Sequence, residues 1–152
     1  MAVLALTLDG VDDEALIDAA LPWTSHFEGL EIWCAYGDRA MRELEHQRER
    51  HGRPHPPPPH APDPDRDQAE AIAARGIELL RARGLTATTR ILGDRDPGHA
   101  LAAATGPNVT LLLAAGHRGG IGPKSVGHVA RFVIDHARGP VIVLRLHNRW
   151  EK

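Results

Sequence analysis

Glycines gather in residues 114–145, between an apolar run and a helical pattern; they are Gly116, Gly119, Gly120, Gly122 and Gly127. Glycines in such a place let a backbone approach a ligand closely, which is what a phosphate-binding loop requires. The free N–H groups and the dipole of the helix that follows favour an anion. Arg118 and Lys124 would add positive charge. The segment therefore raises the question of an anion site.

Three well-known glycine-containing motifs do not fit this segment of the sequence. A Walker A loop would use Lys124-Ser125, but Pro123 and Arg118 occupy its two glycine positions. A serine nucleophile elbow around Ser125 fails because Pro123 again replaces a glycine. No G-x-G-x-x-G motif follows the first predicted strand, so the dinucleotide fingerprint is absent as well.

Asp9 stands at the carboxyl end of the first predicted strand. If that strand neighbours the one before the glycines, Asp9 faces the glycine loop, and its carboxylate would bind a group such as a ribose hydroxyl rather than phosphate. In the other interpretation the glycines only turn the chain and Asp9 caps the first helix. The spacing alone leaves both open.

Apolar strands alternate with helical patterns along the chain. Strands are predicted at 3–8, 30–36, 86–92, 109–115 and 140–146, and helices at 14–21, 68–83, 97–104 and 126–137. Asp12 or Asp13 would cap the first helix and Pro22 would end or kink it. Asp96-Pro97 would start the third helix, and Gly84 would follow the second. The pattern predicts a single α/β domain over residues 1–152, a Rossmann-like, doubly wound sheet of five parallel strands in the order 3-2-1-4-5.

Residues 46–66 interrupt this order with a proline-rich, mobile excursion, "HGRPHPPPPHAPDPDRD" in its main part. The charged stretch before it could be a short helix. Histidines lie in or beside the excursion, at His46, His51, His55 and His60. They favour weak adventitious metal affinity over a specific site, because no cysteine or acidic pair is spaced to complete one.

Composition narrows the function classes. The net charge of -2 argues against nucleic-acid binding, and no apolar run is long enough to span a membrane. Cys34 is the only cysteine, so no disulfide can form within the chain, which fits the cytoplasm. Because Cys34 lies inside an apolar strand, it is interpreted as a buried thiol, and Trp33 beside it as a core residue.

The C-terminal third resembles the signature of the universal stress protein family: glycine, two residues, glycine, nine residues, glycine, then serine or threonine, a helix and a last strand. Gly116 and Gly119 match its first half, and "VGHVARFVIDHARGPVIVL" matches its second. Asp9-Gly10 resembles the aspartate of the family's first strand, and "ILGDRDPGHAL" the end of its third. The similarity covers the chain outside the excursion.

The resemblance implies an adenine-nucleotide site. Asp9 would contact the ribose or adenosine end, and the main chain near Ala35 would meet adenine. Backbone amides at Gly116, Arg118 and Gly119 would line the phosphates. The terminal phosphates would lie at the start of the last helix; the residues there are Gly127, His128 and Val129.

Two departures alter this site. Seven residues, not nine, separate Gly119 from Gly127, and His128 replaces the hydroxyl residue. Ser125 is either a substitute for that hydroxyl or the N-cap of the helix. A neutral His128 still donates one hydrogen bond, and a protonated one attracts phosphate.

The resemblance thus implies a cytoplasmic stress-response protein that binds ATP or another adenine nucleotide, with Mg as the accompanying metal, and hydrolyses ATP slowly at most. Family members often dimerise through the last strand, which here begins at Val141 and reaches Leu146. Two alternatives stay open: a nucleotide-free homologue that acts as a dimeric interaction protein, and an enzyme of the wider adenine-nucleotide α-hydrolase-like group.

Overall fold

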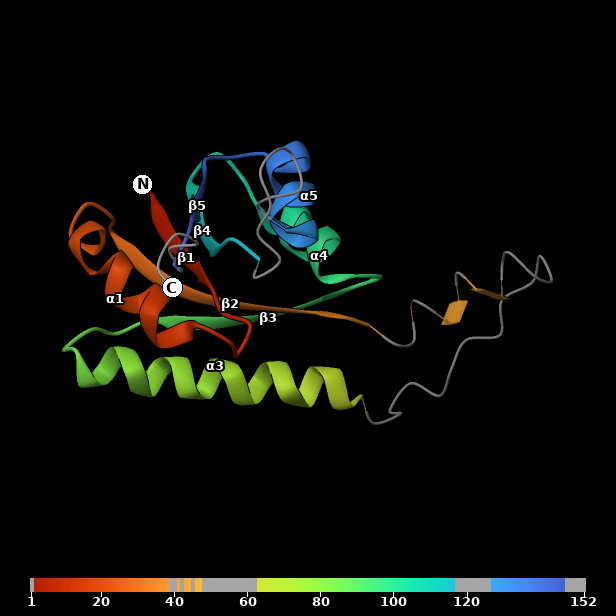
Figure 1. Ribbon diagram of the computed structural model, residues 1–152, viewed down its shortest axis with the longest axis horizontal. Helices are drawn as coiled ribbons and strands as arrows, with labels where there is room; N and C mark the ends of the chain where they lie inside the picture. The colour runs from red at the N-terminus through yellow and green to blue at the C-terminus, as the bar shows by residue number, and fades with distance from the viewer. Residues whose placement is uncertain are drawn as a thin grey trace, which may run out of the picture.

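The computed structural model describes residues 2–38, 41, 43, 44, 46, 47, 63–116 and 127–146. Helices and strands alternate along this part of the chain (Figure 1). They are β1 (Val3–Thr7), α1 (Asp13–Thr24), β2 (Gly29–Gly37), α3 (Pro64–Ala82), β3 (Thr88–Asp94), α4 (Pro97–Ala104), β4 (Val109–Ala114), α5 (His128–His136) and β5 (Val141–Leu144).

The five strands form one parallel sheet in the order β3-β2-β1-β4-β5, which confirms the predicted topology. The register pairs Leu6 of β1 with Ile32 of β2 and with Leu112 of β4. β1 and β4 are therefore neighbours, and their carboxyl ends meet at the same edge of the sheet.

Helices cover both faces of the sheet, with α1 and α3 on one face and α4 and α5 on the other (Figure 1). Successive residues of a strand point to opposite faces. Leu4, Leu6 and Ile32 accordingly join the core beneath α1 and α3. Ala5 and Trp33 join the core beneath α4 and α5, so the prediction of Trp33 as a core residue is confirmed.

Both predicted caps of the later helices are confirmed. The Asp96 carboxylate accepts from the backbone N–H of His99 at the start of α4. Gly84 follows the last turn of α3 with a φ of +76°, a conformation that residues other than glycine rarely adopt.

Two predictions about α1 are confirmed only in part. The helix continues through Pro22 to Thr24, so the proline does not end it. Pro22 sits in the last turn, where it removes one backbone bond while the apolar face stays packed on the sheet; that face is Leu16, Ile17 and Ala20. Asp12 occupies the N-cap position but makes no side-chain cap hydrogen bond.

The predicted end of the proline-rich excursion lies too far along the sequence. α3 begins at Pro64 rather than at Gln68, because the carboxylate of Asp63 accepts from the backbone N–H groups of Asp65 and Arg66 and Pro64 supplies a helical φ. Residues 48–62 lie outside the described part of the chain. In the charged stretch before them, the described residues 41, 43, 44, 46 and 47 are helical.

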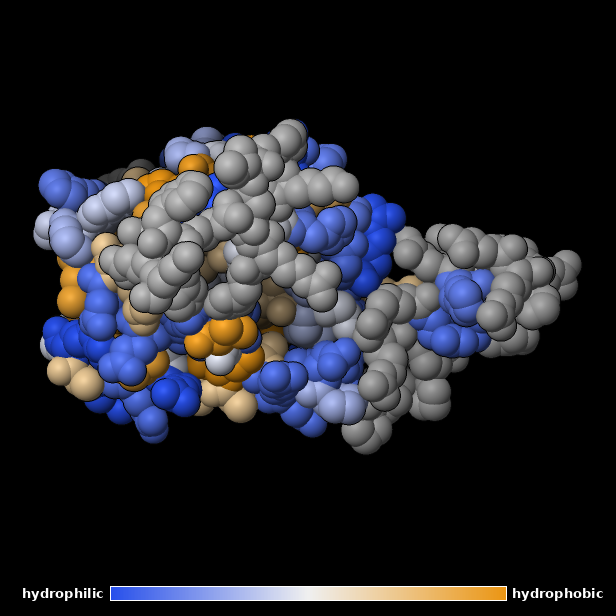
Figure 2. Space-filling model, in the orientation of Figure 1, coloured by the Kyte–Doolittle hydropathy of each residue, from blue (hydrophilic) through white to orange (hydrophobic). Residues whose placement is uncertain are grey.

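The surface is mostly polar. Figure 2 shows an apolar area between α3 and the loop that precedes α1. In the described residues, none of the helices is both long and apolar enough to cross a membrane.

Candidate functional site

The turn after β1 is organised by two carboxylates. The carboxylate of Asp13 accepts from the backbone N–H of Asp9 at 3.1 Å and from that of Gly10 at 3.0 Å. Asp9 uses its own Oδ1 to accept from the N–H of Val11 at 2.9 Å. Asp9 therefore does not cap α1, and that part of the alternative interpretation is wrong. Its Oδ2 makes no hydrogen bond in the described part of the chain and faces solvent.

Asp13 is 8% exposed and is the only buried carboxylate of the described residues. Burial raises its pKa above the ordinary value of 3.8, and the charge of Asp9 adds to this effect. The backbone donors of Gly10 and Asp9 and the charge of Arg75 act in the opposite direction. Asp13 thus holds Asp9 in place, although burial disfavours the charged form of the Asp13 carboxylate.

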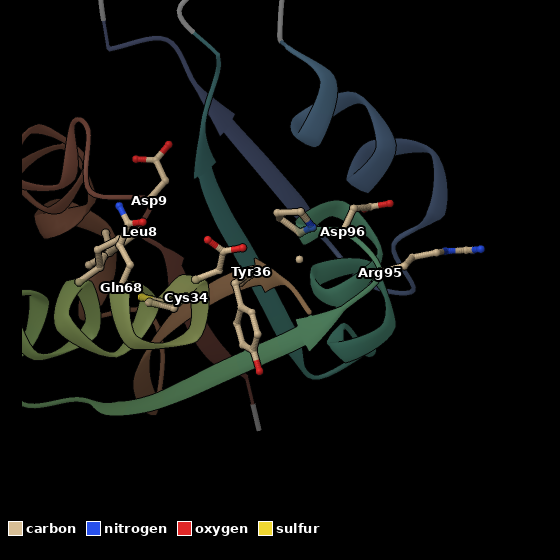
Figure 3. A pocket seen from close by; sticks show the side chains of 13 residues that line it. Leu8, Asp9, Cys34, Tyr36, Gln68, Arg95 and Asp96 are labelled. Atoms are coloured by element: carbon tan, nitrogen blue, oxygen red, sulfur yellow. The ribbon is translucent and has the colours of Figure 1, made fainter. Parts of the chain in front are cut away.

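A cavity of about 440 Å³ opens beside Asp9, at the carboxyl ends of β1, β2 and β3 (Figure 3). Strand residues and one face of α3 line it: Leu8, Asp9, Cys34, Ala35, Tyr36, Gly37, Asp65, Gln68, Ala69, Ile72, Arg95, Asp96 and Pro97. Buried apolar side chains such as Leu8 and Ala69 form its floor. The structure thus brings two of the predicted site residues, Asp9 and Ala35, to one cavity.

The Tyr36 ring helps to shape this cavity. Tyr36 pairs with Gly93 across β2 and β3, and a side chain at position 93 would meet the phenol oxygen at 2.5 Å. Glycine at that position leaves the room in which the ring lies. Burial raises the pKa of Tyr36, so its hydroxyl stays protonated at neutral pH.

Charges at the cavity are mainly negative. Asp9, Asp65 and Asp96 line it, and Figure 3 shows the guanidinium of Arg95 directed away from it. The carboxylate of Asp96 is 2.6 Å from Nδ1 of His99. Partial burial raises the pKa of Asp96, but the hydrogen bonds from His99 outweigh it and the net pKa is lowered. Arg95 is the only cation among these lining residues and its guanidinium is directed away, so a phosphate would meet mainly carboxylates here.

Cys34 lies in the cavity floor and is 1% exposed. Burial, with smaller contributions from the charges of Asp13 and Asp9, raises its pKa to about 12. The thiol is therefore protonated at neutral pH and a poor nucleophile. This confirms the interpretation of Cys34 as a buried thiol.

The second part of the predicted site follows β4. Gly127 is the N-cap of α5, and its φ of +88° brings it against Gly116, so that a Cβ at 127 would lie 2.9 Å from the Gly116 Cα. Ser125 is therefore not the N-cap. No side chain caps α5 among the described residues, so the backbone N–H groups of its first turn keep no side-chain acceptor.

His128 and Val129 begin α5. His128 is exposed, whereas the side chain of Val129 packs on the core beneath α4 and α5, so only its backbone could meet a ligand. Arg118 and Gly119 lie outside the described residues. Of the described members of this part, none is among the residues that line the cavity.

Sequence reasoning missed the contribution of α3. Asp65, Gln68 and Ile72 reach the cavity from one face of this helix, at helical spacing. It took Asp13 only as a possible cap of the first helix, although an aspartate four residues after Asp9 was a usable signal for a turn. The described residues hold no group of three or more side chains able to bind a metal ion. His51, His55 and His60 lie outside them.

Comparison with known proteins extends the picture. No family model and no curated protein matches the sequence. Among solved structures, a universal stress protein from Archaeoglobus fulgidus superposes with a TM-score of 0.63 and 16% identity, covering 95% of this chain and 99% of that one. The structure of the A. fulgidus protein in complex with dAMP gives a TM-score of 0.59 at 16% identity, with 95% and 98% covered.

A universal stress protein in complex with cAMP gives a TM-score of 0.61 at 17% identity, covering 96% of this chain and 98% of that one. These structures span almost the whole of both chains, and the agreement lies in the three-dimensional arrangement rather than in the sequence. The resemblance predicted from the sequence, chiefly from residues 114–145, is therefore confirmed at the level of the structure, and the chain has the fold of the universal stress proteins.

Proposed function

We propose that the chain is a regulatory protein of the universal stress type that binds an adenine nucleotide at the carboxyl edge of its sheet. One observation carries the proposal: an apolar-floored cavity stands beside Asp9, whose Oδ2 is free to accept from a ligand. Base and ribose would occupy the cavity, where the main chain of Ala35 is available. Solved relatives of this fold hold dAMP and cAMP, which supports a nucleotide as ligand.

The phosphates would extend toward Gly116 and Gly127. The cavity itself offers them carboxylates and no inward cation, whereas the first turn of α5 presents backbone N–H groups and the positive end of a helix dipole. The sequence adds Arg118, Gly119 and His128 on that side, with Mg²⁺ as the companion of ATP. The ligand would then act by changing conformation or partners in the cytoplasm rather than through rapid turnover.

The test is direct. The purified protein is denatured, and released nucleotide is separated and identified; thermal unfolding is then followed with ATP, ADP and AMP. Ligand at 100 times its Kd should add about 2.7 kcal/mol to the unfolding free energy. A Gly119→Val variant should lose the shift, because a branched Cβ blocks phosphate approach. No released nucleotide, together with no thermal shift at millimolar ATP, would contradict the proposal.

Dimerisation through β5 is a second proposal, and it holds with or without nucleotide. β5 is an edge strand whose four residues, Val141, Ile142, Val143 and Leu144, are all apolar and half-buried. An exposed apolar edge invites pairing with another strand, and a second copy of the chain supplies an identical one.

The carbonyl of Pro140 accepts from the N–H of Leu111 in β4, and that of Leu144 accepts from the N–H of Ala115 just after β4. The backbone of Val143 between them therefore faces outward. Val143→Pro should therefore abolish a dimer while leaving the β4–β5 ladder intact, and Val143→Ala should not. Light scattering on both variants measures this. A wild-type protein that is monomeric at high micromolar concentration would contradict the dimer.

A further inference from the structure

Gln68 is the residue of α3 that brings an uncharged polar side chain to the cavity. It lines the cavity beside Asp9, is exposed, and makes no side-chain hydrogen bond to any other described residue. The neighbouring cavity residues of α3, Ala69 and Ile72, are apolar and pack on the core. Gln68 therefore has a free donor and a free acceptor at a site otherwise supplied with carboxylates.

The position of Gln68 is set by packing one helical turn away. Ile72 packs against the turn after β1: a Cβ on Gly10 would lie 3.0 Å from the Ile72 Cδ1. Residues four apart on a helix lie on one face, so Gln68 is directed to the same edge of the sheet as Asp9. Figure 3 shows its amide rising from α3 toward the end of β1 where Asp9 stands.

The chemistry of this pair matches two adjacent hydroxyl groups. Each hydroxyl both donates and accepts a hydrogen bond. Asp9 offers only an acceptor, at Oδ2, whereas the amide of Gln68 offers an NH₂ donor and a carbonyl acceptor. Together they satisfy a vicinal diol more fully than either does alone. A phosphorylated sugar would be repelled, because Asp9 and Asp96 both line the space and Arg95 is directed away.

We propose that Gln68, acting with Asp9, recognises the 2′- and 3′-hydroxyl groups of the ribose and makes the site favour nucleotides that keep these hydroxyls. The inference rests on the proposed nucleotide site and adds to it a residue from α3 and a selectivity. Loss of one hydrogen bond of this kind corresponds to about tenfold in affinity.

Isothermal titration with ATP and with 2′,3′-dideoxy-ATP tests this on the full chain. Wild-type protein should bind ATP at least about tenfold more tightly. The variant Gln68→Leu should lose about tenfold in ATP affinity and keep its affinity for the dideoxy compound. The side chain is exposed and leucine is a good helix former, so the fold should persist. Gln47→Leu, at the only other glutamine, is the matched control, since Gln47 lies outside the cavity.

The results that would contradict the inference can be told apart from those that would contradict the proposed function. An equal loss for both nucleotides in Gln68→Leu would place Gln68 on the base and overturn the inference. Unchanged affinities in that variant would also overturn it, while the nucleotide site itself would stand. Absence of ATP binding by the wild-type protein would overturn the proposed function and the inference with it.

Discussion

Gly127 stands directly against the backbone of Gly116: a Cβ at position 127 would lie 2.9 Å from the Gly116 Cα and 3.1 Å from its nitrogen. The two residues flank residues 117–126 in the sequence, and Gly127 directly precedes α5. They are also the first and last glycines of the signature that the sequence presents. Their contact therefore sets how the chain just after β4 meets the start of α5.

Substitution of Gly127 by alanine should destabilise the protein by more than the left-handed conformation alone would cost. That conformation costs an L-residue about 1–2 kcal/mol, and the backbone of Gly116 adds a collision. Gly84→Ala is the matched control, because its φ is +76° and nothing lies within 4 Å of a Cβ there. Urea unfolding of both variants compares the two costs; equal values would show that the Gly116 contact is not tight.

The stability contributed by Asp13 should depend on pH in the sense opposite to that of an ordinary salt-bridged carboxylate. Its pKa is raised in the folded state, so the folded protein binds the proton more tightly than the unfolded chain does. The unfolding free energy should fall as pH rises from 3.8 through the raised folded pKa, and should level off above it.

The variant Asp13→Asn keeps an acceptor for the N–H of Gly10 and removes the charge. Its unfolding free energy relative to wild type should therefore increase over that pH window, as followed by chemical denaturation at a series of pH values. Asp67→Asn, at an exposed carboxylate of α3, is the control. Parallel wild-type and Asp13→Asn curves would show that Asp13 is not responsible.

Cys34 should be protected from alkylation in the folded protein. It is 1% exposed with a pKa of about 12, so at pH 8 it is both inaccessible and protonated. Because it is the only cysteine, mass spectrometry after maleimide treatment reports on it alone. The denatured chain should react at once, and a ligand in the cavity should slow the native reaction further. Rapid labelling of the native protein would contradict the burial of this strand.

Gly76 should not tolerate alanine, although alanine favours helix. A Cβ at position 76 would lie 2.5 Å from Leu8 Cδ1 and 2.8 Å from Ile32 Cδ1, and both side chains are buried. Overpacking of this kind costs about 1–3 kcal/mol, more than the roughly 1 kcal/mol of helix propensity gained. Ala74→Gly, on the exposed face of α3, measures the propensity alone. A more stable Gly76→Ala protein would show that α3 can move away from the sheet.

The sequence alone was sufficient for the order of elements and for the sheet topology. The alternation of apolar strands with helices is a local pattern in the sequence. The rule for connections between parallel strands applies to every fold of this class. The caps at Asp96 and Gly84 could be predicted for the same reason, since the residues that make them are neighbours in sequence. Asp9 was singled out because it ends the first strand, at the edge where such sheets bind ligands, whereas Ala35 came only from the resemblance to the universal stress proteins.

Only the tertiary structure decided how these pieces form a site. The rotation of α3 over the sheet places Gln68 and Ile72 beside Asp9, and it depends on close packing at Gly76 with residues far away in sequence. The sequence placed a cap at Asp12 or Asp13 and a helix end or kink at Pro22, whereas the fold directs the Asp13 carboxylate back to Gly10 and carries α1 past the proline. Such choices are made by side-chain contacts between distant segments, which a local pattern of residue types does not encode.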